Sequence, residues 1–228
     1  MKNNLLLLMM ILGPGFCQIL IAQNLESETD EITKQIILSR DISNGLAPKY
    51  VWTSRTEILK SKEILNIMIE QNQYDQKGQL LQKVLNEQGA KMPTFFLVKE
   101  IAESEKETME KFLFGLRDFL KKYSLQESEQ VKRFLSGATW KVIDSIPEFV
   151  FTGRNVEEEG DLLTWMVDGK SFSTSRIEVN TTFENDLIKF TASFIRLKSG
   201  LNYMAYAEAN IPAKNITLLI HNYDYMQE

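Results

Sequence analysis

The last third of the chain alternates apolar and polar side chains with the period of two that β-strands require. In the run from Ser173 to Phe183, Ile177 and Val179 share one face, while Arg176 and Glu178 share the other. The runs are rich in β-branched and aromatic residues, and the breaks between them carry Asn, Asp, Gly or Pro, as turns require. This pattern is typical of antiparallel strands with one face in water. It predicts strands over residues 161–169, 173–183, 187–197, 201–211 and 213–225.

The N-terminal part of the chain begins with a helix pattern and continues with strand patterns. Ser27 or Thr29 can cap a helix, and Asn44-Gly45 can end it, so a helix is predicted from Ser27 to Asn44. Its apolar side would be formed by Ile32, Ile36, Leu38 and Ile42. Strands are predicted next, over residues 50–59, 63–74 and 80–85.

A second amphipathic helix is predicted from Glu105 to Tyr123. Its apolar residues recur at intervals of three and four: Met109, Phe112, Leu113, Leu116, Leu120 and Tyr123. Phe114 would lie on the opposite side. Ser124 and Glu127 form a capping-box pattern, which predicts a shorter helix that ends at Gly137. Two further strands are predicted over residues 139–143 and 148–152.

These elements predict an α+β fold built on a curved antiparallel sheet, a half-open barrel of about eight or nine strands. A helix with one apolar side is most simply buried against the apolar face of a sheet. We therefore expect the N-terminal helix and the helical insert to pack on that face.

The first 22 residues have the pattern of a secretory signal peptide. Lys2 is followed by an apolar run, a Gly-Pro-Gly break and the small residue Ala22, before the chain turns polar. Cleavage is expected between Ala22 and Gln23, leaving a single domain over residues 23–228 in the periplasm. The alternative is an uncleaved membrane anchor, because the apolar region reaches the lower length limit for a span. Cys17 raises lipidation as a minor option, although bulky Phe16 precedes it.

The composition narrows the partners and the chemistry. With 26 basic and 31 acidic residues, the chain is acidic, which argues against a nucleic-acid partner. The one cysteine lies in the predicted signal peptide, so the mature protein would have no disulfide, as fits a bacterial envelope. His221 is the only histidine, which leaves little material for a catalytic triad or a histidine-rich metal site.

Acidic residues supply the remaining candidate chemistry. Glu157, Glu158 and Glu159 with Asp161 could hold a hard cation, but adjacent acids in a loop more often stay solvated. Arg–Glu pairs two residues apart, at positions 55 and 57 and at 176 and 178, are expected to form ladders on a strand face. Two well-placed carboxylates would suffice for acid–base catalysis, but the sequence identifies no such pair. No catalytic residue, cofactor or metal ligand is assigned, and a non-enzymatic function is expected.

A two-part set of residues resembles a group of uncharacterised exported bacterial proteins. The first part comprises Tyr50, Trp52, Arg55, Glu57, Tyr74, Asp75, Gly78, Leu80 and Lys83. The second comprises Trp165, Asp168, Arg176, Glu178 and the closing Asn222 to Tyr225. The element order is also similar to that of the periplasmic lipoprotein carrier LolA, in which a half-open barrel holds acyl chains in an apolar hollow under helices. None of the carrier's ligand residues maps onto this chain.

The apolar residues of the insert and the strands are the candidate ligand site. Trp52, Trp165, Phe190 and Phe194 are expected to meet Met109, Phe112, Leu116 and Leu120. Such a set either fills a core or lines a cleft. The leading hypothesis is a periplasmic envelope protein that binds a lipid, an acyl chain or the apolar segment of a partner lipoprotein, with peripheral association with the membrane. The alternative is a structural or interaction module with a solid core and no small-molecule ligand.

Overall fold

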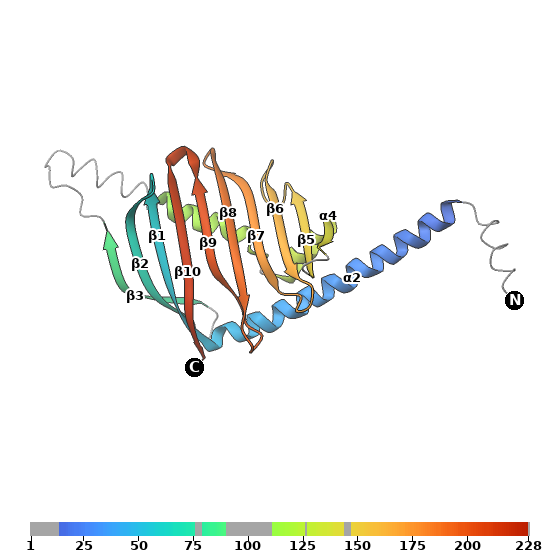
Figure 1. The fold of residues 1–228 in the computed structure, drawn as a ribbon, viewed down its shortest axis with the longest axis horizontal. Helices are drawn as coiled ribbons and strands as arrows, with labels where there is room; N and C mark the ends of the chain where they lie inside the picture. The colour runs from blue at the N-terminus through green and yellow to red at the C-terminus, as the bar shows by residue number, and fades with distance from the viewer. Residues whose placement is uncertain (1–13, 76–78, 90–110, 126, 144–146, 228) are drawn as a thin grey trace.

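The computed structural model describes residues 14–75, 79–89, 111–125, 127–143 and 147–227. Its fold is α+β, with one open antiparallel sheet and a few helices (Figure 1). The strand order is β3-β2-β1-β10-β9-β8-β7-β6-β5-β4. The sheet has ten strands instead of the eight or nine expected, because the short runs predicted at 80–85 and 139–143 both pair, as its two edge strands.

Every predicted strand is present, with boundaries that differ by a few residues. The strands are β1 (Tyr50–Lys60), β2 (Glu63–Tyr74), β3 (Leu80–Gly89), β4 (Thr139–Ile143), β5 (Glu148–Arg154), β6 (Leu162–Asp168), β7 (Thr174–Phe183), β8 (Asp186–Arg196), β9 (Asn202–Ile211) and β10 (Ile216–Gln227). Neighbours from β4 to β10 are consecutive in the chain. The neighbours that are far apart in the chain are β1 and β10, which pair from Tyr50 with Gln227 to Lys60 with Ile216. The last strand therefore joins the N-terminal strands to the meander.

The N-terminal helix is longer than predicted. Helix α2 (Pro14–Leu46) runs without a break and is followed by the 3-10 turn η1 (Ala47–Lys49). Ser27 and Thr29 are interior residues instead of caps, and the Thr29 carbonyl accepts a hydrogen bond from Thr33 Oγ1 at 2.8 Å. Residues 16–26 contain no glycine or proline, so nothing in this stretch interrupts the helix before the predicted start at Ser27. Among the described residues, no helix meets the length and hydropathy that a membrane-crossing helix needs.

The helical insert is described from residue 111 onward, so Met109 lies outside the described residues. A helix over 111–120 leads into the 3-10 turn η2 (Lys121–Ser124) and then α4 (Ser128–Gly137). The capping box lies three residues later than predicted, with Glu127 as the cap and Gln130 as its partner. Leu125 takes a left-handed conformation (φ 48°), which separates η2 from α4 and moves the helix start.

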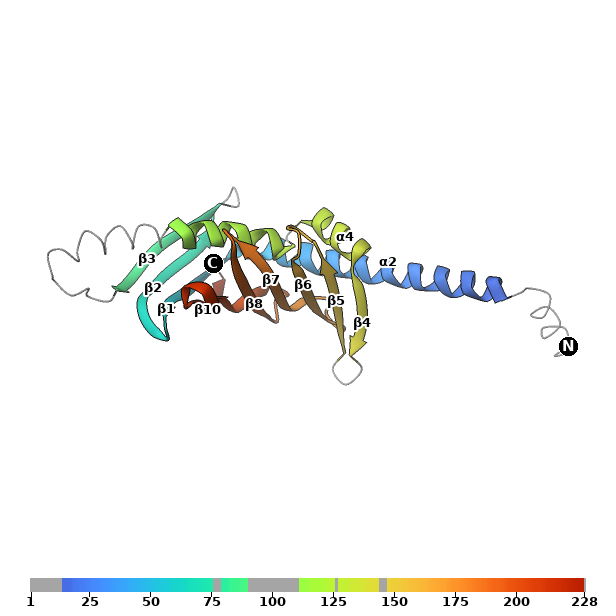
Figure 2. The same ribbon diagram turned by 90° about the horizontal axis from the view of Figure 1, so that it is seen from above.

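Helices 111–120, α2 and α4 lie on the same side of the sheet, with α4 beside β4 to β6 and the 111–120 helix extending toward β1 and β10 (Figures 1 and 2). The ring of Phe183 on β7 lies 5.5 Å from that of Phe112 and 5.1 Å from that of Phe119, measured between centroids. Phe114 points away and is exposed, as its place in the helical pattern predicts. One contiguous core joins the helices to strands β5 to β10.

Candidate functional site

The helices cover the sheet unevenly. On β6, buried residues alternate with half-buried ones, and Leu163, Trp165 and Val167 are fully enclosed. On β1, every residue from Trp52 to Leu59 is half-buried, whichever face it occupies. Strands β2 and β10 likewise have long half-buried stretches. Residues on the inner face are therefore enclosed over β6 but only partly covered over β1, β2 and β10. We call strands β1, β2 and β10 the open half of the sheet, and the part around β6 the sealed half.

In the sealed half, several residues of the predicted apolar set come together. Phe112, Leu116, Leu120 and Trp165 are all buried in the common core. The Trp165 indole donates to Thr174 Oγ1 at 3.1 Å, so its one polar atom is satisfied. Phe190 and Phe194 are partly buried and pack against the same core. These residues therefore belong to one packed core.

Trp52 lies elsewhere, in the open half. Its ring stacks on that of Tyr225 at 5.5 Å with an interplanar angle of 1°, and the Tyr74 ring lies 5.4 Å away. The Tyr203 ring lies 3.9 Å from Tyr225. Burial, then the neighbouring Tyr203 and Tyr74, raise the pKa of Tyr225 well above its ordinary value. These four residues form an aromatic cluster, to which both parts of the sequence pattern contribute because β1 pairs with β10.

A polar ladder crosses the same face of the open half beside the aromatic cluster. Asn72 Nδ2 donates to Ser54 Oγ at 2.9 Å, and Ser54 Oγ in turn donates to Asn222 Oδ1. Asn222 Nδ2 donates to the Met204 carbonyl at 2.8 Å, and Gln82 Nε2 donates to Asn72 Oδ1 at 3.1 Å. The ladder thus links strands β3, β2, β1, β10 and β9 through side chains. The aromatic residues of the two-part sequence pattern lie in this region. The ladder of polar side chains was not predicted, because no sequence motif indicates it.

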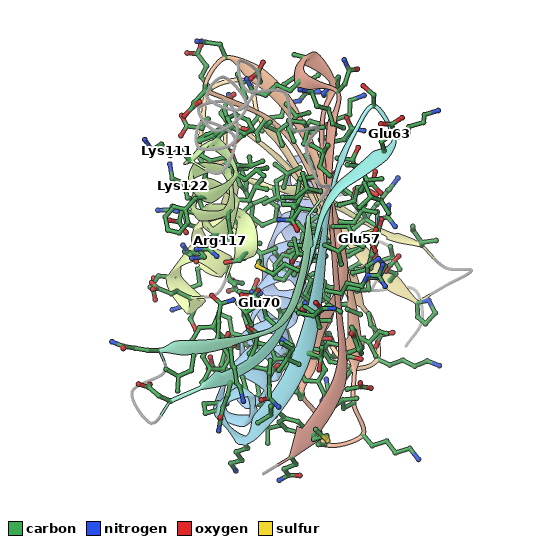
Figure 3. All side chains as sticks on the ribbon, turned by 90° about the vertical axis from the view of Figure 1, so that its left-hand side faces the viewer. Glu57, Glu63, Glu70, Lys111, Arg117 and Lys122 are labelled. Atoms are coloured by element: carbon green, nitrogen blue, oxygen red, sulfur yellow. The ribbon has the colours of Figure 1, made fainter. Side chains whose placement is uncertain are left out.

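Apolar side chains lie on the far side of the ladder from the aromatic cluster. Ile58, Leu218 and Ile220 are half-buried and pack against the core. Burial raises the pKa of Glu70 on β2, while the charge of Arg117 on the 111–120 helix opposes that rise. Figure 3, seen from the β3 side, shows Arg117 and Glu70 near each other.

Asp161, in the acidic loop considered as a cation site, is instead hydrogen-bonded to the loop backbone and to Tyr123. The Asp161 carboxylate accepts the backbone N–H groups of Val156, Glu157 and Glu158 at 2.6, 3.0 and 3.0 Å, and the Tyr123 hydroxyl at 2.8 Å. Burial raises the pKa of Asp161, but these hydrogen bonds outweigh burial and hold it below its ordinary value. Within the described ranges, no group of three or more His, Cys, Asp or Glu residues is placed to hold a metal ion.

The expected Arg–Glu ladders form on the opposite face of the sheet. Arg55 Nε lies 2.8 Å from Glu57 Oε1, and Arg176 Nε lies 2.6 Å from Glu178 Oε1. His221 is exposed, with its ring 4.9 Å from that of Tyr206. Both Arg–Glu pairs are partly exposed, so screening by water limits their contribution to the stability of the fold.

Fold and site together define an α+β protein with an open antiparallel sheet, one face of which is helix-covered over part of its width. No protein-family model matches the chain, and no curated protein matches it in sequence. Among solved structures, the chain is similar to a DUF1329 family protein from Desulfovibrio piger, at 7% identity and a TM-score of 0.42. The alignment covers 88% of this chain and 93% of that one. A likeness this weak establishes neither the fold family nor the function.

Proposed function

We propose that this protein is an exported, non-enzymatic envelope protein that binds a lipid or acyl chain on the open half of its sheet. The observation that carries the proposal is uneven burial: alternate residues of β6 are fully enclosed, whereas most residues of β1 and β2 and the first residues of β10 are only half-buried. In this proposal the sheet acts as a LolA-like half-open barrel, and the helical insert is the cover of its apolar face.

The open half has the surface chemistry that an acyl chain needs. Ile58, Leu218 and Ile220 offer a half-buried apolar surface, and each methylene buried there contributes about 0.8 kcal/mol. The amide ladder presents polar groups beside the apolar surface, which suits the polar end of a lipid. The sealed half, with Leu116 and Trp165 fully enclosed, supplies rigidity instead of contacts with the lipid.

Export to the periplasm is part of the proposal. Cleavage between Ala22 and Gln23 would remove the first part of α2 and leave residues 23–46 as the N-terminal helix of the mature protein. Mass spectrometry of protein recovered from the periplasm should give a chain that begins at Gln23. A chain that retains Met1 would instead support the anchored alternative.

Two neighbouring leucines provide a matched test of lipid binding. Leu218 shares its face with Ile58 and Ala209, whereas Leu219 pairs with Glu57 and Glu208 on the opposite face, and both leucines are half-buried. Leu218→Gln should weaken binding of a fluorescent fatty acid at least tenfold, equivalent to about 1.4 kcal/mol. Leu219→Gln should leave binding within about twofold, because it lies outside the proposed site. Equal effects of both variants, or wild-type protein with no co-purified lipid and no binding, would overturn the proposal.

A second candidate function has one observation in its favour. Edge strand β3 exposes Leu80, Leu81, Val84 and Leu85, each by about half of its surface. An exposed apolar edge strand can pair with another protein, which would suit an interaction module of the envelope. Cross-linking in cells that returned one protein partner, from a sample without bound lipid, would favour this function over lipid binding.

A further inference from the structure

A small cavity of about 60 Å³ lies where α2 crosses the ends of strands β6 to β9. Ser39, Ser43 and Asn202 contribute to its polar wall, and Trp165, Phe172 and Phe194 contribute to its apolar wall. Since water occupies about 30 Å³ in the liquid, the cavity has room for about two waters or a group of a few heavy atoms.

Arg40 is half-buried and lines this cavity with its positive charge. Its guanidinium lies 5.8 Å from the centre of the Trp165 ring, and its Nη2 donates to the Ser124 carbonyl. Its Nε is buried and has no hydrogen-bond partner among the described residues. No carboxylate in the described part of the chain forms an ion pair with Arg40, and its neighbour Asp41 is exposed. A charge partly buried in this way is costly unless an anion or hydrogen-bond acceptor joins it.

The cation remains charged at neutral pH. Burial lowers the pKa of Arg40 to about 10, against the opposing effect of Asp41, so the guanidinium stays protonated near pH 7. A second arginine reinforces the positive field, because Arg196 Nη1 donates to Ser39 Oγ at 3.0 Å and to the Ser171 carbonyl at 2.9 Å. An anion in the cavity would therefore be held by Arg40 with support from Arg196.

The cavity wall also presents an unsatisfied acceptor. Asn202 Nδ2 donates to the Thr174 carbonyl at 3.0 Å, which fixes the orientation of the amide. Its Oδ1 is buried without a partner among the residues described. A ligand that fits both walls carries an anionic acceptor for Arg40 and gains further from a hydroxyl donor for Asn202.

We infer that this cavity binds a small carboxylate. The volume suits a carboxylate with one or two further heavy atoms, the desolvated guanidinium supplies one balancing charge, and the aromatic wall suits a short apolar substituent. A doubly charged phosphate fits less well, because Arg40 is the only arginine that lines the cavity in the described part of the chain. The site is separate from the open half and does not depend on lipid binding.

Carboxylate probes at constant ionic strength test this inference. Sodium acetate should raise the Tm of the full-length protein saturably, glycolate should do so at lower concentration because of its hydroxyl group, and sodium chloride should have no such effect. Arg40→Lys keeps the charge but lacks the Nε–H donor, so we expect at least a tenfold loss of acetate affinity by calorimetry. The control Arg133→Lys alters an exposed arginine paired with Glu157 on the surface and should bind like wild type.

A second variant covers the case in which Arg40→Lys fails to fold. Asn202→Asp places a negative charge on the cavity wall and should abolish acetate binding by repelling the anion and neutralising Arg40. The inference is overturned if neither acetate nor glycolate binds saturably to wild type, because the cavity would then hold only water. It is also overturned if binding survives unchanged in both cavity variants.

Discussion

The Asp161 carboxylate organises the 154–161 connection, and its removal should cost much more stability than its single charge suggests. The side chain is 1% exposed and accepts three backbone N–H groups and the Tyr123 hydroxyl. Tyr123 also contacts Thr181 Oγ1 at 3.0 Å, which ties the connection to β7. Asp161→Asn keeps the shape of the side chain but removes the charge and turns an NH₂ group toward other donors.

The expected loss follows from these contacts. Hydrogen bonds to a charged group contribute about 1.5–3 kcal/mol each, and the remaining oxygen of Asn retains part of the set. We expect Asp161→Asn to lower the free energy of unfolding by about 3 kcal/mol. For a domain of this size each kcal/mol lowers Tm by roughly 2–4 °C, so Tm should fall by about 6–12 °C.

Urea unfolding followed by circular dichroism would measure this loss, with Glu159→Gln as the matched control. Glu159 is exposed in the same loop and should change stability by less than about 0.5 kcal/mol. Because the folded pKa of Asp161 is depressed, its contribution is present above the unfolded pKa of about 3.9 and is lost as pH falls through the folded pKa. The gap between wild type and Asp161→Asn should therefore shrink as the pH falls below the unfolded pKa. A gap under about 1 kcal/mol at neutral pH, or one that does not change with pH, would refute this reasoning.

Two further predictions concern packing, and both are read from denaturant unfolding. Leu116→Ala should cost about 3–5 kcal/mol because the side chain is fully buried, whereas Phe114→Ala on the exposed side of the same helix should cost less than about 1 kcal/mol. A small loss at Leu116 would mean that the helix is loosely packed. Gly153→Ala should cost about 1–3 kcal/mol, because an added Cβ would lie 2.6 Å from Phe134 Cε2, whereas Gly137→Ala meets nothing within 4 Å and should be tolerated. Equal tolerance at both glycines would show that Phe134 can move aside.

Local pattern was sufficient for most of the strands. The predicted bounds of β2 and β4 agree with the observed strands, because alternation and turn residues lie within each run. Local pattern failed at the start of α4. Ser124 and Glu127 fit the usual capping-box pattern, but the left-handed Leu125 separates η2 from α4, and the box forms between Glu127 and Gln130, a pair that the pattern does not include. The start of α2 was misplaced because Ser27 and Thr29 are acceptable caps that the continuing helix does not need.

The candidate sites depended on tertiary structure. Trp52 was expected beside Trp165, but the pairing of β1 with β10 places it against Tyr225, and strand order cannot be read from periodicity. The predicted inner face of α2 was half right, because Ile32 and Ile36 are buried. Leu38 and Ile42 are exposed instead, and Ser39 and Ser43 are buried near Arg40.

By itself, the sequence determined the element types, the alternation of the strands and the composition that disfavours histidine or thiol chemistry, because each of these properties is local or additive along the chain. Only the tertiary structure decided where the helices leave the sheet partly uncovered and which side of α2 faces inward. Those features arise from contacts between residues far apart in the chain, where packing selects among faces that local pattern leaves equivalent.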